Sequence, residues 1–244
     1  MELVDRVALV TGGAVRLGRA IALTLAQHGA HVVISYRTSR DQAHETLERL
    51  RDLGSRAQAI RADVSDAKDV SALIARIQRK FGRLDVLVNN ASIFKRTPFA
   101  TLTESAWDAH LDANLKGPFL CALAASRLMK RRGGGKIINI ADWAGDRPYR
   151  DYLPYCVSKA GLIALTKALA KELAPSIQVI AIAPGPILPP PGMTPAARRR
   201  AVQRLPLKRW GSPQDIASAV TFALGATDFI TGTTIYVDGG RLIA

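Results

Sequence analysis

Short apolar runs alternate with longer amphipathic segments from one end of the chain to the other. The runs are rich in β-branched residues, as in strands buried on both faces, and the segments between them carry apolar residues at helical spacing. The pattern predicts seven strands, at residues 6–10, 31–35, 56–62, 84–89, 136–141, 177–183 and 233–237. It predicts helices at about residues 16–28, 40–53, 66–81, 104–115 and 118–131, and a long helix from about residue 152 to 173.

This order of elements predicts the fold class. Strands that alternate with helices imply right-handed crossovers and a parallel sheet covered on both faces. We therefore expect an α/β fold, a doubly wound seven-stranded parallel sheet (Rossmann fold), formed by residues 1–244 as a single domain. The irregular stretch 184–195 holds six of the thirteen prolines and follows the end of a strand, where open α/β sheets bind ligands. We interpret residues 184–210 as a substrate loop; a rigid connector is the alternative.

The composition narrows the class of protein and its location. The chain is 48% hydrophobic, enough for a continuous core, and no stretch approaches the roughly 20 uninterrupted apolar residues of a membrane span. The net charge of +14 comes from scattered basic residues without interleaved aromatics, so we expect solvated surface with a minority lining an anion site, and neither nucleic-acid nor membrane partners. Cys121 and Cys156 match no metal spacing and no signal peptide precedes the first strand, which predicts a metal-free cytoplasmic protein.

The candidate catalytic residues follow the fifth predicted strand. Asp142 stands where this strand ends, and Tyr155 and Lys159 lie four apart on one face of the next helix. A carboxylate, a phenol and an ammonium thus meet at the carboxyl end of a strand. Because an ammonium stabilises a phenolate, we expect Lys159 to lower the pKa of Tyr155 from its ordinary value of about 10 and allow proton transfer. Taken alone, the spacing also fits an ordinary amphipathic helix.

A glycine-rich turn joins the first predicted strand to the first helix. Gly12, Arg16, Leu17 and Gly18 belong to the segment Thr-Gly-Gly-Ala-Val-Arg-Leu-Gly. Such a turn presents backbone N–H groups and the positive end of a helix to a pyrophosphate, which predicts a dinucleotide-binding domain. Arg16 stands where these turns usually have a second glycine, so its guanidinium would face the phosphates or the adjoining pocket; the alternative is a solvent-facing residue.

The residues after the second and third strands indicate which dinucleotide is bound. An enzyme that uses NAD usually has Asp or Glu after the second strand, where it binds the ribose 2′-hydroxyl group. Here Tyr36, Arg37 and Thr38 occupy this place without an acid, and a guanidinium beside hydroxyl groups suits a 2′-phosphate, so we expect NADPH/NADP. Asp63 and Val64 are expected at the adenine edge, although Asp63 could instead cap the next helix.

The end of the fourth strand supplies the expected cofactor wall. Asn90, Ala91 and Ser92 lie there, beside the predicted channel, with an ordinary polar turn as the alternative. Asn114 lies within a predicted helix and would by default be a polar surface residue.

Together these motifs resemble a known family across the whole chain. The shared features, in order, are Thr-Gly-x-x-x-(Gly/Arg)-x-Gly, Asn-Asn-Ala, Asn114, Tyr155-x-x-x-Lys159 and Pro184-Gly185. The chain therefore resembles the short-chain dehydrogenase/reductases. It is most similar to the pteridine reductases, because of Arg16, the segment Asn-Asn-Ala-Ser-Ile-Phe that ends at Phe94, and Asp142 in place of the more frequent serine. The proline-rich loop departs from the family pattern and leaves the size of the substrate open.

The resemblance implies roles for these residues. It implies that Phe94 stacks on a pterin and that Arg16, Ser92, Asp142 and Tyr155 face the cofactor or the substrate. It implies catalytic roles for Asp142, Tyr155, Lys159 and Asn114, the last through a water leading to Lys159. The implied cofactor contacts are Gly12, Arg16, Leu17, Gly18, Tyr36, Arg37, Thr38, Asp63, Val64, Asn90, Ala91, Ser92, Tyr155, Lys159, Pro184, Gly185 and Ile187. It also implies a homotetramer, in agreement with a helix at 156–173 that is apolar on more than one side.

Asp142 bears most directly on the substrate. A serine there would donate a hydrogen bond to a ketone oxygen, whereas an ionised aspartate has no proton to donate and would repel the developing alkoxide. Its lone pairs suit a ring rich in N–H donors, such as a pterin, and burial would raise its pKa toward a protonated form able to do either. We therefore expect NADPH-dependent reduction of a C=N bond in a pterin or folate. The alternatives are a carbonyl reductase, for example of 3-oxoacyl thioesters, and a non-catalytic nucleotide- or RNA-binding protein.

Overall fold

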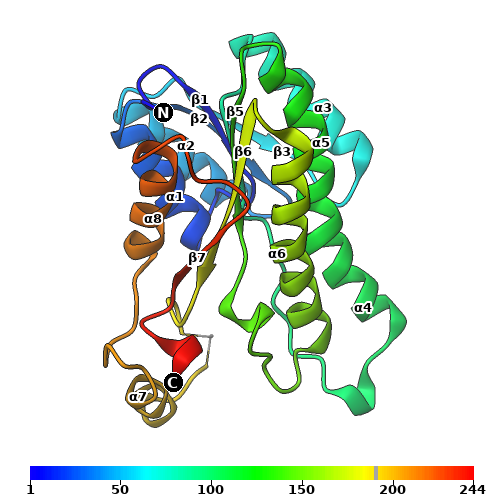
Figure 1. The fold of residues 1–244 in the computed structure, drawn as a ribbon, viewed down its shortest axis with the longest axis vertical. Helices are drawn as coiled ribbons and strands as arrows, with labels where there is room; N and C mark the ends of the chain where they lie inside the picture. The colour runs from blue at the N-terminus through cyan, green and yellow to red at the C-terminus, as the bar shows by residue number, and fades with distance from the viewer. Residues whose placement is uncertain (190–191) are drawn as a thin grey trace.

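A parallel sheet of seven strands forms the centre of the molecule (Figure 1). The computed structural model describes residues 1–189 and 192–244. The strands follow the order β3-β2-β1-β4-β5-β6-β7, and every neighbouring pair is parallel. Their bounds are β1 (Val7–Val10), β2 (His31–Tyr36), β3 (Gln58–Arg61), β4 (Val86–Asn89), β5 (Gly135–Ile140), β6 (Ile177–Pro184) and β7 (Thr234–Val237). All seven predicted strands are confirmed, and each boundary shifts by no more than a few residues.

Helices cover both faces of this sheet. In Figure 1, α1, α2 and α8 lie on one side and α3, α5 and α6 on the other. The bounds are α1 (Arg16–Gln27), α2 (Arg40–Asp52), α3 (Ala67–Phe81), α4 (Glu104–Leu111), α5 (Gly117–Lys130), α6 (Leu153–Leu173), α7 (Pro195–Gln203) and α8 (Pro213–Gly225). Successive side chains of β1 alternate between the two layers, because Ala8 and Val10 pack with the first group and Val7 and Leu9 with the second. The predicted doubly wound α/β fold is therefore confirmed.

Two of these helices were absent from the sequence-based expectation. α7 lies within the predicted substrate loop, and Thr194 caps its first turn by accepting a hydrogen bond from the Ala197 amide. α8 begins with a capping box in which Ser212 and Asp215 satisfy each other's backbone N–H groups. The capping box was readable in the sequence. The short basic α7 has no buried residue, so no apolar periodicity predicts it.

A chain of polar side chains crosses the buried sheet and fixes α6 against it. Asn89 of β4 and Asn139 of β5 stand in register, and the amide nitrogen of Asn89 donates to the Asn139 oxygen over 2.9 Å. Asn139 in turn donates to the Thr166 hydroxyl of α6, also over 2.9 Å. Because unpaired buried amides are costly, this chain favours a single placement of α6 on the sheet.

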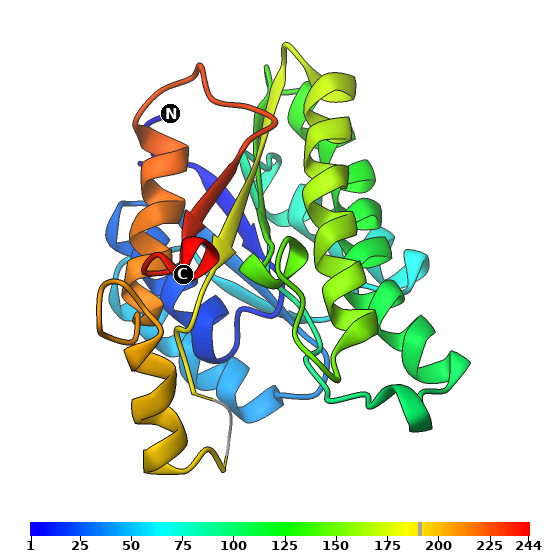
Figure 2. The same cartoon turned by 60° about the horizontal axis from the view of Figure 1, so that its bottom comes forward.

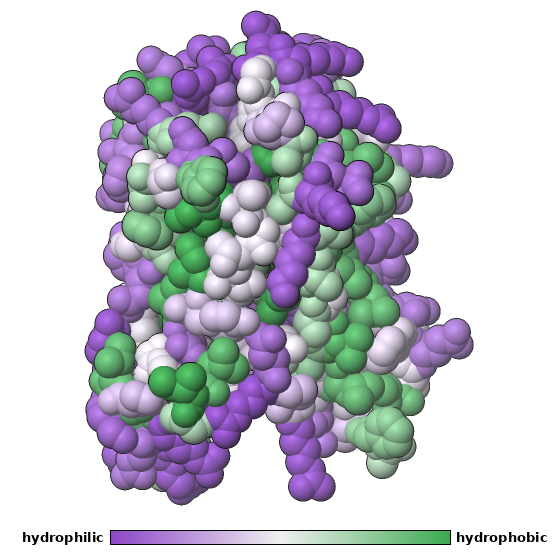
Figure 3. Space-filling model, in the orientation of Figure 1, coloured by the Kyte–Doolittle hydropathy of each residue, from purple (hydrophilic) through white to green (hydrophobic). Residues whose placement is uncertain are grey.

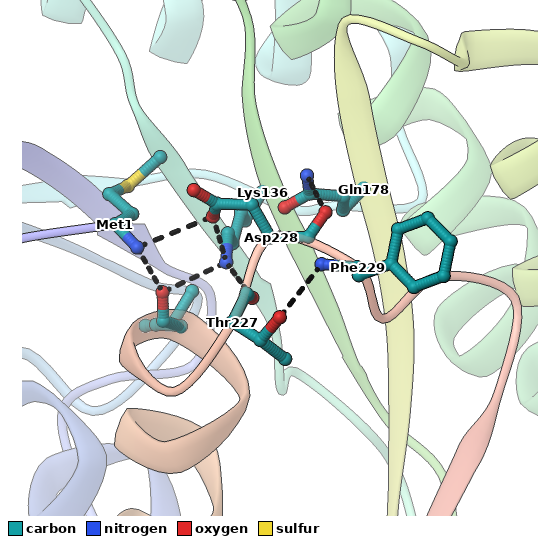
Figure 4. A network of polar contacts seen from close by, with 7 residues as sticks. Met1, Lys136, Gln178, Thr227, Asp228 and Phe229 are labelled. Carbon is teal, nitrogen blue, oxygen red and sulfur yellow. Dashed lines mark hydrogen bonds and ion pairs between the residues drawn. The ribbon is translucent and has the colours of Figure 1, made fainter.

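A buried lysine ties β5 to the end of α8 (Figure 4). Lys136 is only 1% exposed, although its strand was predicted from apolar character. Its ammonium donates to the main-chain oxygens of Leu224 and Thr227, both at 2.9 Å, and pairs with Asp228 at 2.8 Å. The Met1 amino group contacts Leu224 and Asp228 as well. The charge is tolerated in the core because each of its three protons has an acceptor.

The irregular stretch after β6 was predicted only in part. β6 extends to Pro184 and α7 begins at Pro195, so both ends of the stretch belong to regular elements. Residues 190 and 191 lie outside the described residues. Within the described part of the chain, no helix has both the length and the apolar character needed to cross a membrane.

Candidate active site

A cleft of about 930 Å³ opens at the carboxyl ends of the strands. Figure 2 brings this end of the molecule forward. The cleft brings together every predicted cofactor and substrate residue, and of the candidate set only Asn114 lies outside its lining. These lining residues are Gly12, Arg16, Leu17, Gly18, Tyr36, Arg37, Thr38, Asp63, Val64, Asn90, Ala91, Ser92, Phe94, Asp142, Tyr155, Lys159, Pro184, Gly185 and Ile187.

The glycine-rich turn packs too closely for larger residues. Gly12 has φ +63°, and a Cβ at Gly18 would stand 2.3 Å from the Gly12 oxygen. The side-chain amide of Asn90 donates to the Thr11 oxygen at 2.8 Å and to the Gly12 oxygen at 3.2 Å, which ties the turn to the end of β4. The cradle and the start of α1 at Arg16 fit a dinucleotide pyrophosphate.

Arg16 adopts the backbone conformation of the glycine that it replaces. Its φ of 51° lies in the left-handed region, which non-glycine residues rarely occupy. Its side chain lines the cleft, which fits the expectation of a fixed cation beside the phosphates.

Arg37 and Asp63 face each other across the far end of the cleft. Arg37 Nη1 stands 3.3 Å from Asp63 Oδ2. Burial acts to raise the pKa of Asp63, but hydrogen bonds from Ser65 and Arg37 outweigh it and hold the pKa below its ordinary value. Asp63 does not cap the next helix, because Asp66 is the N-cap of α3. Arg37 is thus held at the end of β2 by an exposed ion pair that a phosphate could replace.

Asp142, Tyr155 and Lys159 converge where β5 ends. The Tyr155 hydroxyl donates to Asp142 Oδ2 at 2.7 Å, and the Ala144 amide donates to Oδ1 at 2.8 Å. Lys159 donates to the Ile140 main-chain oxygen at 2.7 Å, and its nitrogen lies 5.7 Å from the centre of the Tyr155 ring. Tyr155 and Lys159 are both buried and both line the cleft, so the arrangement is more than an amphipathic helix surface.

The expectation of a lowered pKa for Tyr155 is wrong in this structure, because the net shift is upward. Burial, followed by the adjacent Asp142 carboxylate, raises the pKa of Tyr155 well above its ordinary value. Burial also lowers the pKa of Lys159 to about 8. It raises the pKa of Asp142, and the hydrogen bonds that Asp142 accepts from Ala144 and Tyr155 offset this rise only in part. The phenol is therefore a protonated donor to Asp142, and the sequence could not show this because the bond depends on how Asp142 is turned.

Asn114 has a different place from the one expected by default. It is 1% exposed and lies in a π-helical turn, Asp112–Lys116, inserted between α4 and α5. Its oxygen accepts from the Ile93 amide at 2.8 Å and its nitrogen donates to the Ser158 hydroxyl at 3.1 Å. Asn114 thus holds the loop after β4 against α6. Its partner on α6, Ser158, directly precedes Lys159 in the sequence. A role in a water path stays a prediction.

Aromatic side chains form one wall of the cleft, and only Phe94 and Tyr155 among them were expected from the sequence. Phe94 stacks on Tyr152 with ring centres 4.5 Å apart and planes at 9°, and its edge contact with Tyr155 spans 4.7 Å. Tyr149 stands 3.5 Å from Asp142 Oδ1, and its ring meets Trp143 edge-on. The recurrence of tyrosine at every third residue, at 149, 152 and 155, was a readable signal, although only Tyr155 lies within α6. A flat apolar ring would find matching surfaces here.

The fold and the cleft define a Rossmann-fold oxidoreductase, and comparison with known proteins gives the family. The family model described as Enoyl-(Acyl carrier protein) reductase matches residues 13–241. The chain is 41% identical to the 3-oxoacyl-[acyl-carrier-protein] reductase FabG of Staphylococcus aureus over 239 residues, 96% of each chain. The chain belongs to the short-chain dehydrogenase/reductase family.

Solved structures agree with this assignment. A blue fluorescent protein from a metagenomic library, in complex with NADPH, superposes with a TM-score of 0.92 at 33% identity, covering 99% of both chains. A 7 alpha-hydroxysteroid dehydrogenase, complexed with NADH and 7-oxo glycochenodeoxycholic acid, gives 0.93 at 32% identity, covering 98% of this chain and 96% of the other. These relatives carry names other than pteridine reductase, so the finer resemblance stays a prediction.

Proposed function

We propose that the protein is an NADPH-dependent reductase of a pterin-like heterocycle, acting on a C=N bond. The observation that carries this proposal is the hydrogen bond from the Tyr155 hydroxyl to Asp142, 2.7 Å long, at the wall of an aromatic cleft. Asp142 stands beside the phenol as an acceptor, where a serine would be a donor. A ring with an amino group and ring N–H groups supplies the donors that such an acceptor requires.

The nucleotide-binding residues favour NADPH. Arg37 lies beside Thr38 and Ser39 at the rim of the cleft, and its ion-pair partner is Asp63, which follows β3 rather than β2. A guanidinium there can bind a phosphate with two parallel hydrogen bonds. When bound, the nicotinamide would supply the hydride. The glycine cradle would hold its pyrophosphate.

The chain's own residues provide the proton. Tyr155, whose pKa is kept high by burial and by Asp142, would donate its proton to the ring nitrogen that gains electron density. Asp142 would orient both the phenol and the N–H groups of the ring, and the neighbouring Lys159 would favour the phenolate once the proton has left. Phe94 would cover one face of the ring, as the family resemblance implies.

A second candidate has support of its own. The relatives named as 3-oxoacyl-[acyl-carrier-protein] reductases favour reduction of a 3-oxoacyl thioester, and they support that reading better than pterin reduction. Asp142 is compatible with reduction of a 3-oxoacyl thioester only in its protonated form. Because burial raises its pKa, a protonated Asp142 would have a hydrogen for the carbonyl oxygen, as a serine has.

One set of assays separates the two candidates. Turnover of dihydrobiopterin, dihydrofolate and acetoacetyl-CoA with NADPH is compared for the wild type, Asp142→Ser, Asp142→Asn and the control Asp146→Asn, from pH 5 to 9. Asp146 lies four residues further on, is exposed and does not line the cleft.

For a pterin reductase, Asp142→Ser lowers pterin turnover by about 10²–10⁴-fold while activity on the ketone holds or rises. Asp142→Asn removes the pH dependence due to the carboxyl group, and Asp146→Asn changes nothing. Unchanged pterin turnover in Asp142→Ser would remove the main support for the proposal. A wild type that reduces only acetoacetyl-CoA, and does so faster as Asp142→Ser, would establish the second candidate.

A further inference from the structure

A second cavity, of about 460 Å³, adjoins the cleft and is strongly basic. Four of the residues that line it carry positive side chains: Arg147, Arg204, Lys208 and Arg241. The three arginines also line the cleft, so the two spaces share a wall. We call this second space the basic pocket.

The basic pocket lies on the substrate side of the cleft. Its residues come from the loop after β5, the end of α7 and the C-terminal segment, whereas Arg16 and Arg37 follow β1 and β2. Trp143 links the basic pocket to the catalytic group, because it follows Asp142 in sequence and the Arg241 guanidinium lies 4.9 Å from its ring centre. In Figure 1 the C-terminal segment lies beside α7, and in Figure 3 the surface over α7 is hydrophilic, below a green patch at the C-terminal segment.

The positive charges of the basic pocket lack carboxylate side-chain partners. Within the described residues, none of the four side chains forms an ion pair with Asp or Glu. Lys208 donates to the Gln203 main-chain oxygen at 2.7 Å, and Arg147 contacts main-chain oxygens of the C-terminal segment, including that of Ala244. A carboxylate at Ala244 would offset one charge and leave three.

Arg241 stands among like charges. Burial first, and then the neighbouring Arg147 and Arg204, lower the pKa of its guanidinium, against the smaller opposing effects of Tyr149 and Asp238. Asp238 is itself occupied, since its carboxylate accepts from the amides of Gly240 and Leu242. Like charges held together at a cavity wall are expected where an anion is bound between them.

We propose that the basic pocket binds a carboxylate or phosphate carried by the substrate at some distance from its reacting atoms. Which anion is bound rests on the proposed function. For a folate the anion is a carboxylate of the glutamate, and for the second candidate it is the phosphate of a pantetheine thioester. Either way, the enzyme would prefer an anionic substrate over a neutral analogue with the same reacting group.

The test removes one charge from the basic pocket and one from a matched place outside it. Arg204→Ala is compared with Arg204→Lys, which keeps the charge, and with Arg200→Ala, which removes an exposed arginine of α7 that lines neither cavity. Calorimetry measures the binding of N-(4-aminobenzoyl)glutamate and 4′-phosphopantetheine against the neutral 4-aminobenzamide and pantetheine. Kinetics then give the preference for dihydrofolate over dihydrobiopterin, and for acetoacetyl-CoA over acetoacetyl-pantetheine.

We expect at least one anionic fragment to bind the wild type more tightly than its neutral counterpart. Arg204→Ala should weaken that binding, and the matching kinetic preference, about five- to tenfold, whereas Arg204→Lys and Arg200→Ala keep both. Equal binding of charged and neutral fragments, or equal losses in Arg204→Ala and Arg200→Ala, overturns the inference. If anion binding depends on Arg204 but neither pterin nor folate is reduced, the proposed function fails and the basic pocket stands.

Discussion

The burial of Lys159 predicts a pH-dependent cost in stability that substitution would reveal. In the folded protein its pKa falls from 10.5 to about 8, because burial disfavours the ammonium. Below pH 8 the lysine is protonated in both the folded and the unfolded state, and folding includes the full cost of burying it. A pKa that differs by one between the two states corresponds to about 1.4 kcal/mol, so the cost is on the order of 3 kcal/mol.

The sign of the pH dependence follows from proton binding. Between pH 8 and 10.5 the unfolded state holds the proton and the folded state does not, so the free energy of unfolding of the wild type rises by up to about 1.4 kcal/mol for each increase of one in pH. Lys159→Met lacks this contribution. Its advantage over the wild type should therefore be greatest at pH 7 and shrink toward pH 10. The stability that Lys159→Met gains over the wild type is reduced at every pH, because the Ile140 main-chain oxygen loses its hydrogen-bond donor.

The assay is urea unfolding of the wild type, Lys159→Met and the control Lys167→Met, at intervals from pH 7 to 10. Lys167 lies exposed on the same helix, so it contributes the loss of a lysine without a buried charge. We expect the free-energy difference between Lys159→Met and the wild type to narrow by about 2–3 kcal/mol over this range, and that of Lys167→Met to stay constant. A constant difference for Lys159→Met would refute the assigned burial cost.

Two further predictions concern the cofactor and the assembly. Arg37→Asp should lower the affinity for NADPH by about ten- to a hundredfold and leave NADH binding largely unchanged. Fluorescence titration measures both affinities, with Arg40→Asp as the control. Equal use of both cofactors by the wild type would contradict the role of Arg37. The homotetramer stays a prediction. It is favoured by exposed apolar side chains on two helices, Phe119 and Leu123 of α5 and Val157 of α6, and Figure 3 shows a green surface over these helices. Leu123→Glu should lower the mass seen by light scattering, and a wild type of only 26.3 kDa at micromolar concentration would exclude the tetramer.

The seven strands, most of the helices between them and the convergence of the candidate residues on one cleft were readable from the sequence, because the patterns that predict them are local. The central strands are buried on both faces and so appear as short apolar runs, as β5 and β6 do. The turn at Gly12 and the four-residue spacing of Tyr155 and Lys159 follow from backbone geometry within one or two turns. Parallel strands that share one direction then bring these residues to the same edge of the sheet.

Only the tertiary structure decided the electrostatics of the site and the second cavity. The pKa of Tyr155 rises first because packing buries the phenol, and second because Asp142, thirteen residues away, turns its carboxylate toward it. This direction is opposite to the one predicted from Lys159 alone. Asn114 is buried because a π-helical turn rotates it inward, and no periodic pattern encodes that turn. The basic pocket joins residues 147, 204, 208 and 241, which are scattered along the chain and line one cavity only because the segments after β5, β6 and β7 meet. Charge and burial at a site depend on neighbours that are distant in sequence, and those neighbours are set by packing.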